Sequence, residues 1–217
     1  TTAKKPVIIL KGGKTEAGSK AAASHTGAMA SDYTIWAAVI RQHGGLLVDN
    51  FDQLMHLVML GTAKKLLRGK HVGFLGAGGG VSVLFSDLAV QAGLVLPELS
   101  ARAQQKISEK IMGVNTSTVN PVDLGAFGFD LNVMLHTMKA IDQDEGIDVI
   151  VPYFSVEYIM RSETILQVKN NADTIMEMAH QINKPVIPIL SSFVEDNLDV
   201  ERTRITAFAA LRNAGFP

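Results

Sequence analysis

The chain has 217 residues, of which 47% are hydrophobic and 19% are charged, as in globular proteins with a buried core. Its 20 basic and 21 acidic residues nearly balance, which argues against a nucleic-acid surface, and no apolar run approaches the roughly 18 residues that span a bilayer. It has no cysteine, so disulfides, thiolate catalysis and cysteine-based zinc sites are excluded. We therefore expect a cytoplasmic protein without a membrane or nucleic-acid partner.

The first part of the chain alternates short apolar runs with helical patterns. Residues 7–10 are apolar and rich in β-branched side chains, which predicts a buried strand. Residues 11–31 are rich in Gly, Ala, Ser and Thr without a clear period, so we expect a loop with short helical pieces at most. The patterns that follow predict a helix between Ser31–Asp32 and Gly44, a strand at 46–48 and a helix at 51–67.

A polar break at residues 68–70 precedes a longer series, and we place a domain boundary after residue 68. Beyond it, strands alternate with helices, which predicts βαβ units and a parallel sheet. The expected strands are residues 72–75, 94–96, 149–154 and 186–190, and the expected helices are residues 81–92, 101–112, 131–141, 164–181 and 200–213. Because the strand runs are continuously apolar, we expect an α/β fold with helices on both faces of the sheet.

A glycine-rich turn, residues 76–80, joins the strand at 72–75 to the next predicted helix. Strand, glycine turn and helix is an order that directs free backbone amides at an anion, at the edge of a parallel sheet where ligands bind. The dinucleotide-binding pattern G-x-G-x-x-G is incomplete, because Val81 stands at the third glycine position. A tight turn without any ligand remains an alternative.

The segment before the first predicted helix contains a histidine among small residues, in the sequence Ser24-His25-Thr26-Gly27. The neighbouring Gly12-Gly13-Lys14-Thr15 resembles the end of a P-loop, but Ile8 occupies the position of the required first glycine, so that interpretation fails. A neutral imidazole is nucleophilic near neutral pH, and a phosphate on it would need helix N-termini to stabilise its charge. An exposed histidine without a role is the alternative.

Three ordered motifs resemble the ADP-forming acyl-CoA synthetases, relatives of succinyl-CoA synthetase. Residues 6–30, PVIILKGGKTEAGSKAAASHTGAMA, are similar to the histidine region of that family. Residues 72–100 are similar to the start of its second flavodoxin-like domain. Asn120-Pro-Val-Asp-Leu124 matches a further motif.

The resemblance implies flavodoxin-like parallel sheets in two domains: residues 1–68, a partial domain that carries the phosphohistidine loop, and residues 69–217, a succinyl-CoA synthetase-like domain. It implies that His25 is phosphorylated during catalysis, and that two helix N-termini hold the phosphate. The residues implied in phosphate binding are Ser24, Thr26, Gly27, Gly78, Gly79, Gly80 and Val81. Supporting roles are implied for Lys11, Lys14, Asn120 and Asp123, and no residue is expected to bind a metal.

The implied reaction joins a small carboxylic acid to CoA, with interconversion of ATP and ADP and with Mg²⁺ accompanying the nucleotide. The family's CoA-binding Rossmann domain and ATP-grasp domain lie outside the matched motifs, so we expect a fragment of an oligomeric enzyme whose other domains are in the same chain or in a separate subunit. A silent regulatory module, such as one fused to an acetyltransferase, and a dinucleotide-binding module are the alternatives. His25 favours the enzyme over the regulator, and the incomplete glycine pattern disfavours the dinucleotide binder.

Overall fold

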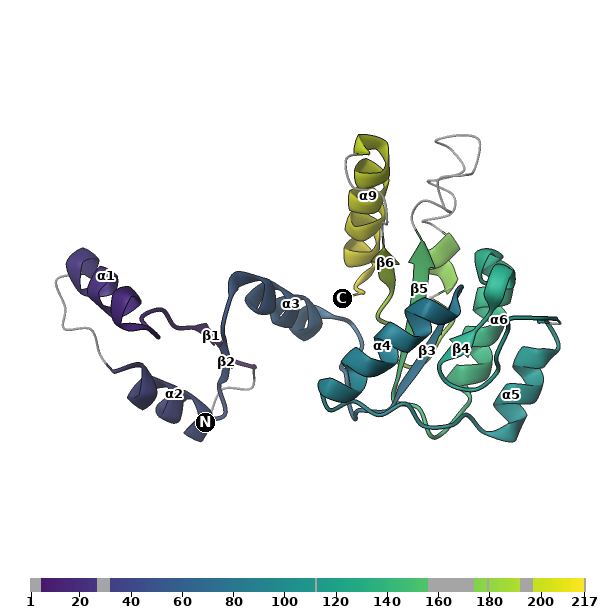
Figure 1. Ribbon diagram of the computed structural model, residues 1–217, viewed down its shortest axis with the longest axis horizontal. Coiled ribbons are helices and arrows are strands. Elements are labelled where there is room, and N and C mark those ends of the chain that lie inside the picture. The colour runs from purple at the N-terminus through teal and green to yellow at the C-terminus, as the bar shows by residue number, and fades with distance from the viewer. Residues whose placement is uncertain are drawn as a thin grey trace. The chain divides into compact units, whose positions relative to one another are not determined.

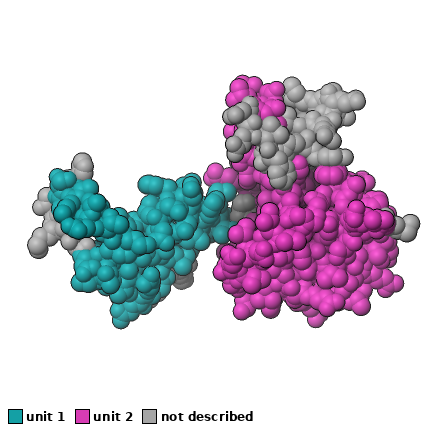
Figure 2. Space-filling view, viewed as in Figure 1, with its two compact units in different colours: residues 1–63 teal, residues 64–217 magenta. Residues whose placement is uncertain are grey.

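The computed structural model describes residues 5–26, 32–111, 113–155, 174–178, 180–191 and 197–216. The chain forms two compact units, unit 1 with residues 1–63 and unit 2 with residues 64–217 (Figure 2). This division falls after residue 63, whereas the sequence predicts a boundary after residue 68. Each unit contains one parallel sheet among its described residues.

The described residues of unit 1 form a two-stranded parallel sheet and three helices. Strand β1 (Ile8–Leu10) pairs with β2 (Leu46–Val48), with Ile8 opposite Leu46. The helices are α1 (Glu16–Thr26), α2 (Tyr33–Gln42) and α3 (Phe51–Thr62), labelled in Figure 1. Asp32 and Asn50 accept hydrogen bonds from the amides of Thr34 (2.7 Å) and Gln53 (2.8 Å), so both cap the helices that follow them. Helix α3 begins at the predicted residue 51 but ends at Thr62, before the predicted residue 67.

Helix α1 corrects the expectation of a loop over residues 11–31, because Glu16–Thr26 are continuously helical. The segment is rich in alanine, the strongest helix former, and Thr15 Oγ1 accepts a hydrogen bond from the Gly18 amide (3.1 Å) at its start. Lys20 and Glu16 form an ion pair (2.7 Å) one turn apart. Local helix propensity therefore outweighs the glycines, which suggested a loop.

Unit 2 contains a four-stranded parallel sheet in the order β4-β3-β5-β6. Its strands are β3 (Val72–Gly76), β4 (Val122–Asp123), β5 (Val149–Ser155) and β6 (Ile189–Ser191). Its named helices among the described residues are α4 (Gly79–Gln91), α5 (Ala101–Ser108), α6 (Leu131–Asp142) and α9 (Leu198–Ala214), labelled in Figure 1, and the 3₁₀ helix η1 (Gly125–Phe129). Strand β3, which comes first in the sequence of this unit, lies between β4 and β5. This is the strand order of flavodoxin-like folds.

Both faces of this sheet are buried. Leu75, Ile150 and Phe154 belong to one apolar cluster, which also includes residues of α5, α6 and α9. Phe74 belongs to a second cluster, in which its ring stacks on Phe85 of α4 at a centroid distance of 4.1 Å. Successive strand residues therefore contact helices on opposite faces, and the predicted α/β fold with parallel sheets is confirmed.

Several predicted elements of unit 2 differ in detail. Residues 94–96 form no strand, because Val95 makes only a single bridge with His71. Helix α5 ends at Ser108, before the predicted residue 112, and α4 begins at Gly79, before the predicted residue 81. The helix predicted at 164–181 lies mostly outside the described residues, and residues 174–178 within it are helical. Among the described residues, no helix has the length and hydrophobicity needed to cross a membrane.

Candidate functional site

The carboxyl ends of β1 and β2 bring together the loop after β1 and the start of α3. Lys14 donates to Asp49 Oδ1 (2.7 Å), and this hydrogen bond raises the pKa of Lys14 and lowers the pKa of Asp49. Lys11 Nζ donates to the neighbouring carbonyl of Gly12 (2.7 Å). Lys14 therefore connects the segment before α1 to the end of β2. Among the described residues, the side chain of Lys11 donates only to the neighbouring carbonyl.

His25 lies in the last turn of α1, not in a loop. Ser24 in the same turn donates to the carbonyl of Ala21 (2.8 Å), so its hydroxyl satisfies the helix backbone. Gly27 lies outside the described residues. The C-terminal end of a helix carries a partial negative charge, so α1 itself offers no stabilisation to a phosphate near its end, and such a group needs donors from elsewhere.

The glycine turn of unit 2 begins helix α4 at the carboxyl edge of the sheet. Gly78 has φ 113° and ψ 117°, a conformation that only glycine adopts readily, and α4 begins at the next residue. Within the described parts of the chain, no group accepts a hydrogen bond from the amides of Gly79, Gly80 or Val81. No described atom lies within 4 Å of a β-carbon built on Gly78 or Gly80. The turn thus presents amides without acceptors at the positive end of a helix dipole, and Gly78, Gly79 and Gly80 are exposed.

Asp123 at the end of β4 contacts this turn directly. Its Oδ1 accepts hydrogen bonds from the amides of Gly78 (3.1 Å) and Gly125 (2.9 Å). A β-carbon built on Gly128 of η1 would lie 2.9 Å from the amide nitrogen of Ala77, so η1 packs closely on the same turn. The structure therefore brings together the predicted residues Gly78, Gly79 and Asp123.

Asn120 lies elsewhere and has a different environment. It is buried, it donates to the carbonyls of Val72 (2.7 Å) and Pro97 (2.9 Å), and its Oδ1 accepts from the amide of Phe74 (3.0 Å). These bonds occupy both polar atoms of the side chain and attach it to the backbone of β3. Its geometry indicates a structural role, and the peptide bond to Pro121 is cis.

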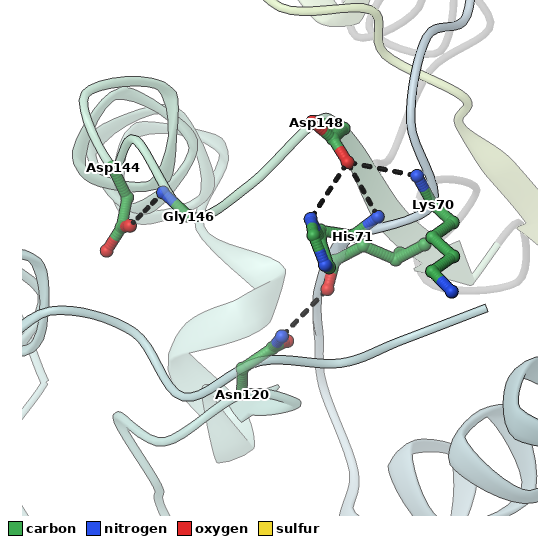
Figure 3. A network of polar contacts seen from close by, with 7 residues as sticks. Lys70, His71, Asn120, Asp144, Gly146 and Asp148 are labelled. Carbon is green, nitrogen blue, oxygen red and sulfur yellow. Dashed lines mark hydrogen bonds and ion pairs between the residues drawn. The ribbon is translucent and has the colours of Figure 1, made fainter.

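A second aspartate joins the amino ends of β3 and β5 and was not singled out by the sequence. Asp148 Oδ2 accepts from the amides of Lys70 (2.9 Å) and His71 (2.8 Å), and it lies 3.1 Å from His71 Nδ1 (Figure 3). The hydrogen bond from the His71 amide lowers the pKa of Asp148 most. A β-carbon on Gly69 would lie 2.1 Å from Asp148 Oδ2, so only glycine fits there.

The carboxyl edge of β5 and β6 holds another polar pair that the sequence analysis missed. Ser191 Oγ donates to the hydroxyl of Tyr153, which is buried, and the Tyr153 side chain lies against Gly76. The two residues are far apart in sequence, so no local pattern predicts the contact. The described residues contain no group of three or more histidine, aspartate or glutamate side chains that could hold a metal ion.

Comparison with known proteins relates this chain to the ADP-forming acid–CoA ligases. Residues 1–60 match the model of the succinyl-CoA ligase like flavodoxin domain. The alpha subunit of an ADP-forming acetate–CoA ligase II from Pyrococcus furiosus is 34% identical over 152 residues, 69% of this chain and 32% of that relative. An ADP-forming acetate–CoA ligase II from Archaeoglobus fulgidus is 33% identical over 158 residues, 70% of this chain and 23% of that relative.

Solved structures show the same fold. A protein from Pyrococcus horikoshii superimposes with a TM-score of 0.71 at 22% identity, over 99% of this chain and 42% of that one. A dinucleotide forming acetyl-coenzyme A synthetase from Ca. Korarchaeum cryptofilum, in complex with phosphate and ADP, gives a TM-score of 0.67 at 21% identity, over 97% of this chain and 47% of that one. The predicted resemblance is confirmed, and the chain spans a third or less of the two curated relatives named above.

Proposed function

We propose that this chain, which is homologous to the ADP-forming acid–CoA ligases, is the phosphotransfer part of such an enzyme. The enzyme would join a small carboxylic acid to CoA, with ATP converted reversibly to ADP and phosphate. CoA and the nucleotide would bind to domains or subunits beyond this chain, such as a Rossmann domain and an ATP-grasp domain. Mg²⁺ would accompany the nucleotide, and we assign it no step, because the described residues offer no cluster to hold it.

His25 would carry the phosphoryl group between the nucleotide and the acyl phosphate. A ring nitrogen of the neutral imidazole attacks the terminal phosphorus of ATP, a new N–P bond forms, and the P–O bond to ADP breaks. In the opposite direction the donor is an acyl phosphate, and the leaving group is the carboxylate. Because α1 ends close to His25 with its negative pole, the phosphate must be stabilised by donors outside that helix.

The observation that carries the proposal is the turn at the start of α4. Three consecutive amides, those of Gly79, Gly80 and Val81, have no acceptor among the described residues and lie at the positive end of a helix of 13 residues. The turn follows β3, at the edge of the sheet where flavodoxin-like folds bind their ligands. We propose that these amides bind phosphate oxygens, with Gly78 providing the backbone conformation.

The parent enzyme offers a direct test of His25. It is incubated with ATP and Mg²⁺, and phosphorylated residues are mapped by mass spectrometry under conditions that preserve phosphoramidates. We expect phosphate on His25, its absence in His25→Ala, and loss of acid–CoA ligation in that variant. His56→Ala is the matched control, because His56 is an exposed histidine of α3 in the same unit. Normal turnover by His25→Ala would refute the proposal and favour a silent module.

A further inference from the structure

Asp123 is placed to control the turn at the start of α4. It pairs with Gly76 in the register of β3 and β4, and the adjacent amide of Leu124 donates to the carbonyl of Gly76 (2.9 Å). The side chain of Asp123 extends to the turn itself, where its Oδ1 accepts a hydrogen bond from the amide of Gly78 (3.1 Å). A second hydrogen bond, from the amide of Gly125 (2.9 Å), fixes the orientation of the carboxylate.

The hydrogen bond to Gly78 has a consequence for the amides that follow. Gly78 can adopt many backbone conformations, because glycine has no β-carbon. Packing does not restrict it either, since nothing lies within 4 Å of a β-carbon built at this position. The bond from its amide to Asp123 selects one of them, with φ 113°. Because the next residue begins α4, the direction of the free amides of Gly79 and Gly80 depends on this selection.

The second carboxylate oxygen adds a charge effect. No donor among the described residues reaches Asp123 Oδ2, which lies 3.1 Å from a β-carbon built on Gly79. A negative charge is therefore held beside the first turn of α4. It interacts favourably with the helix N-terminus and repels any anion that binds to the same amides.

We infer that Asp123 is a positioning residue of the phosphate site: its hydrogen bond prepares the turn, and its charge limits how tightly the turn holds phosphate. The inference rests on the proposed function, because that proposal places phosphate at this turn. A site in a phosphotransfer enzyme must release the phosphate again after binding it. The Asp123 carboxylate weakens phosphate binding by repulsion, while all the amide donors of the turn stay in place. Asparagine and alanine separate the two effects, since asparagine keeps an accepting oxygen without the charge, whereas alanine keeps neither.

The test uses the 217-residue chain, its variants Asp123→Asn and Asp123→Ala, and inorganic phosphate as the probe. Phosphate binding is measured from NMR shifts of the Gly79, Gly80 and Val81 amides, and hydrogen exchange of the Gly78 amide is measured without phosphate. We expect Asp123→Asn to bind phosphate about tenfold more tightly than the unmodified chain, through loss of repulsion. We expect Asp123→Ala to bind less tightly than Asp123→Asn and to exchange at Gly78 about tenfold faster, through loss of a hydrogen bond to a charged acceptor.

The matched control is Asp148→Ala, which removes a carboxylate that also accepts two backbone amides, at the opposite edge of the same sheet. It should alter neither phosphate affinity nor exchange at Gly78. Equal phosphate affinity in the unmodified chain and in Asp123→Asn would overturn the inference, as would unchanged Gly78 exchange in Asp123→Ala. If Asp123→Ala does not fold, the comparison with Asp123→Asn decides.

A failure of the proposed function looks different from a failure of this inference. If phosphate shifts none of the α4 amides in the unmodified chain, the proposed phosphate site is refuted. The exchange rates at Gly78 still decide whether Asp123 sets the turn, because they are measured without phosphate.

Discussion

Removing the Asp148 carboxylate should destabilise unit 2 in a pH-dependent way. Asp148 accepts the backbone amides of Lys70 and His71 at 2.9 and 2.8 Å, and its side chain is 31% exposed. In Asp148→Ala both amides lose their charged acceptor at the amino edge of the sheet. Asp148→Asn keeps an accepting oxygen at the same place but loses the charge, so it should lie between the unmodified chain and the alanine variant.

The magnitude follows from these two bonds. A hydrogen bond to a charged group contributes about 1.5–3 kcal/mol, and partial exposure of Asp148 lets water replace part of it. We therefore expect Asp148→Ala to lower the free energy of unfolding by about 3 kcal/mol at neutral pH. For a chain of this size that corresponds to a decrease in Tm of about 6–12 °C.

The dependence on pH gives the sharper test. The amide hydrogen bonds hold the pKa of Asp148 below its usual value of 3.8 in the folded state. Its contribution to stability is therefore complete above that value and is lost as the pH falls through the lower folded-state pKa. Thermal unfolding followed by far-UV circular dichroism should show a large difference between the variant and the unmodified chain at neutral pH, decreasing in acid. A difference in Tm that stays constant with pH, or none at neutral pH, would refute this reasoning.

Two further substitutions test other contacts. Asn120→Ala should lower the free energy of unfolding in urea by about 2–4 kcal/mol, because it leaves the amide of Phe74 and the carbonyl of Val72 without their buried partner; an unchanged midpoint would contradict this. Lys14→Met should leave Tm unchanged within error, because the ion pair with Asp49 is exposed. It should raise the pKa of Asp49 toward 3.8 in a carboxyl NMR titration. No change in that pKa would show that the pair does not form in solution.

The elements that the sequence predicts well are those whose stabilising interactions are local. The caps Asp32 and Asn50 determine where α2 and α3 begin, and the long apolar run of β5 needs no distant information to be recognised as a strand. The error at α1 has a local cause too. Residues 11–31 lack a clear hydrophobic period, which predicts a loop, but the alanines among residues 16–26 favour a helix without one.

The elements that the sequence misses depend on distant partners. Strand β4 has only two residues, Val122 and Asp123, and becomes a strand because β3 lies beside it. The run at 94–96 is apolar enough for a strand but makes a single bridge, with His71. Tertiary pairing overrides local pattern in both cases. The order of strand, glycines and helix predicts the Gly76–Gly80 turn, but it cannot predict the hydrogen bond to Asp123, because 45 residues separate Gly78 from its acceptor.

Two aspartates at opposite edges of the unit 2 sheet use the same hydrogen-bonding device with different results. At the amino edge, one oxygen of Asp148 accepts both consecutive amides of residues 70 and 71. At the carboxyl edge, one oxygen of Asp123 also accepts two amides, but they belong to separate segments, Gly78 of the turn and Gly125 of η1. The amides of Gly79, Gly80 and Val81 have no acceptor among the described residues. These three amides are therefore left available, which is what the phosphate site proposed above would need.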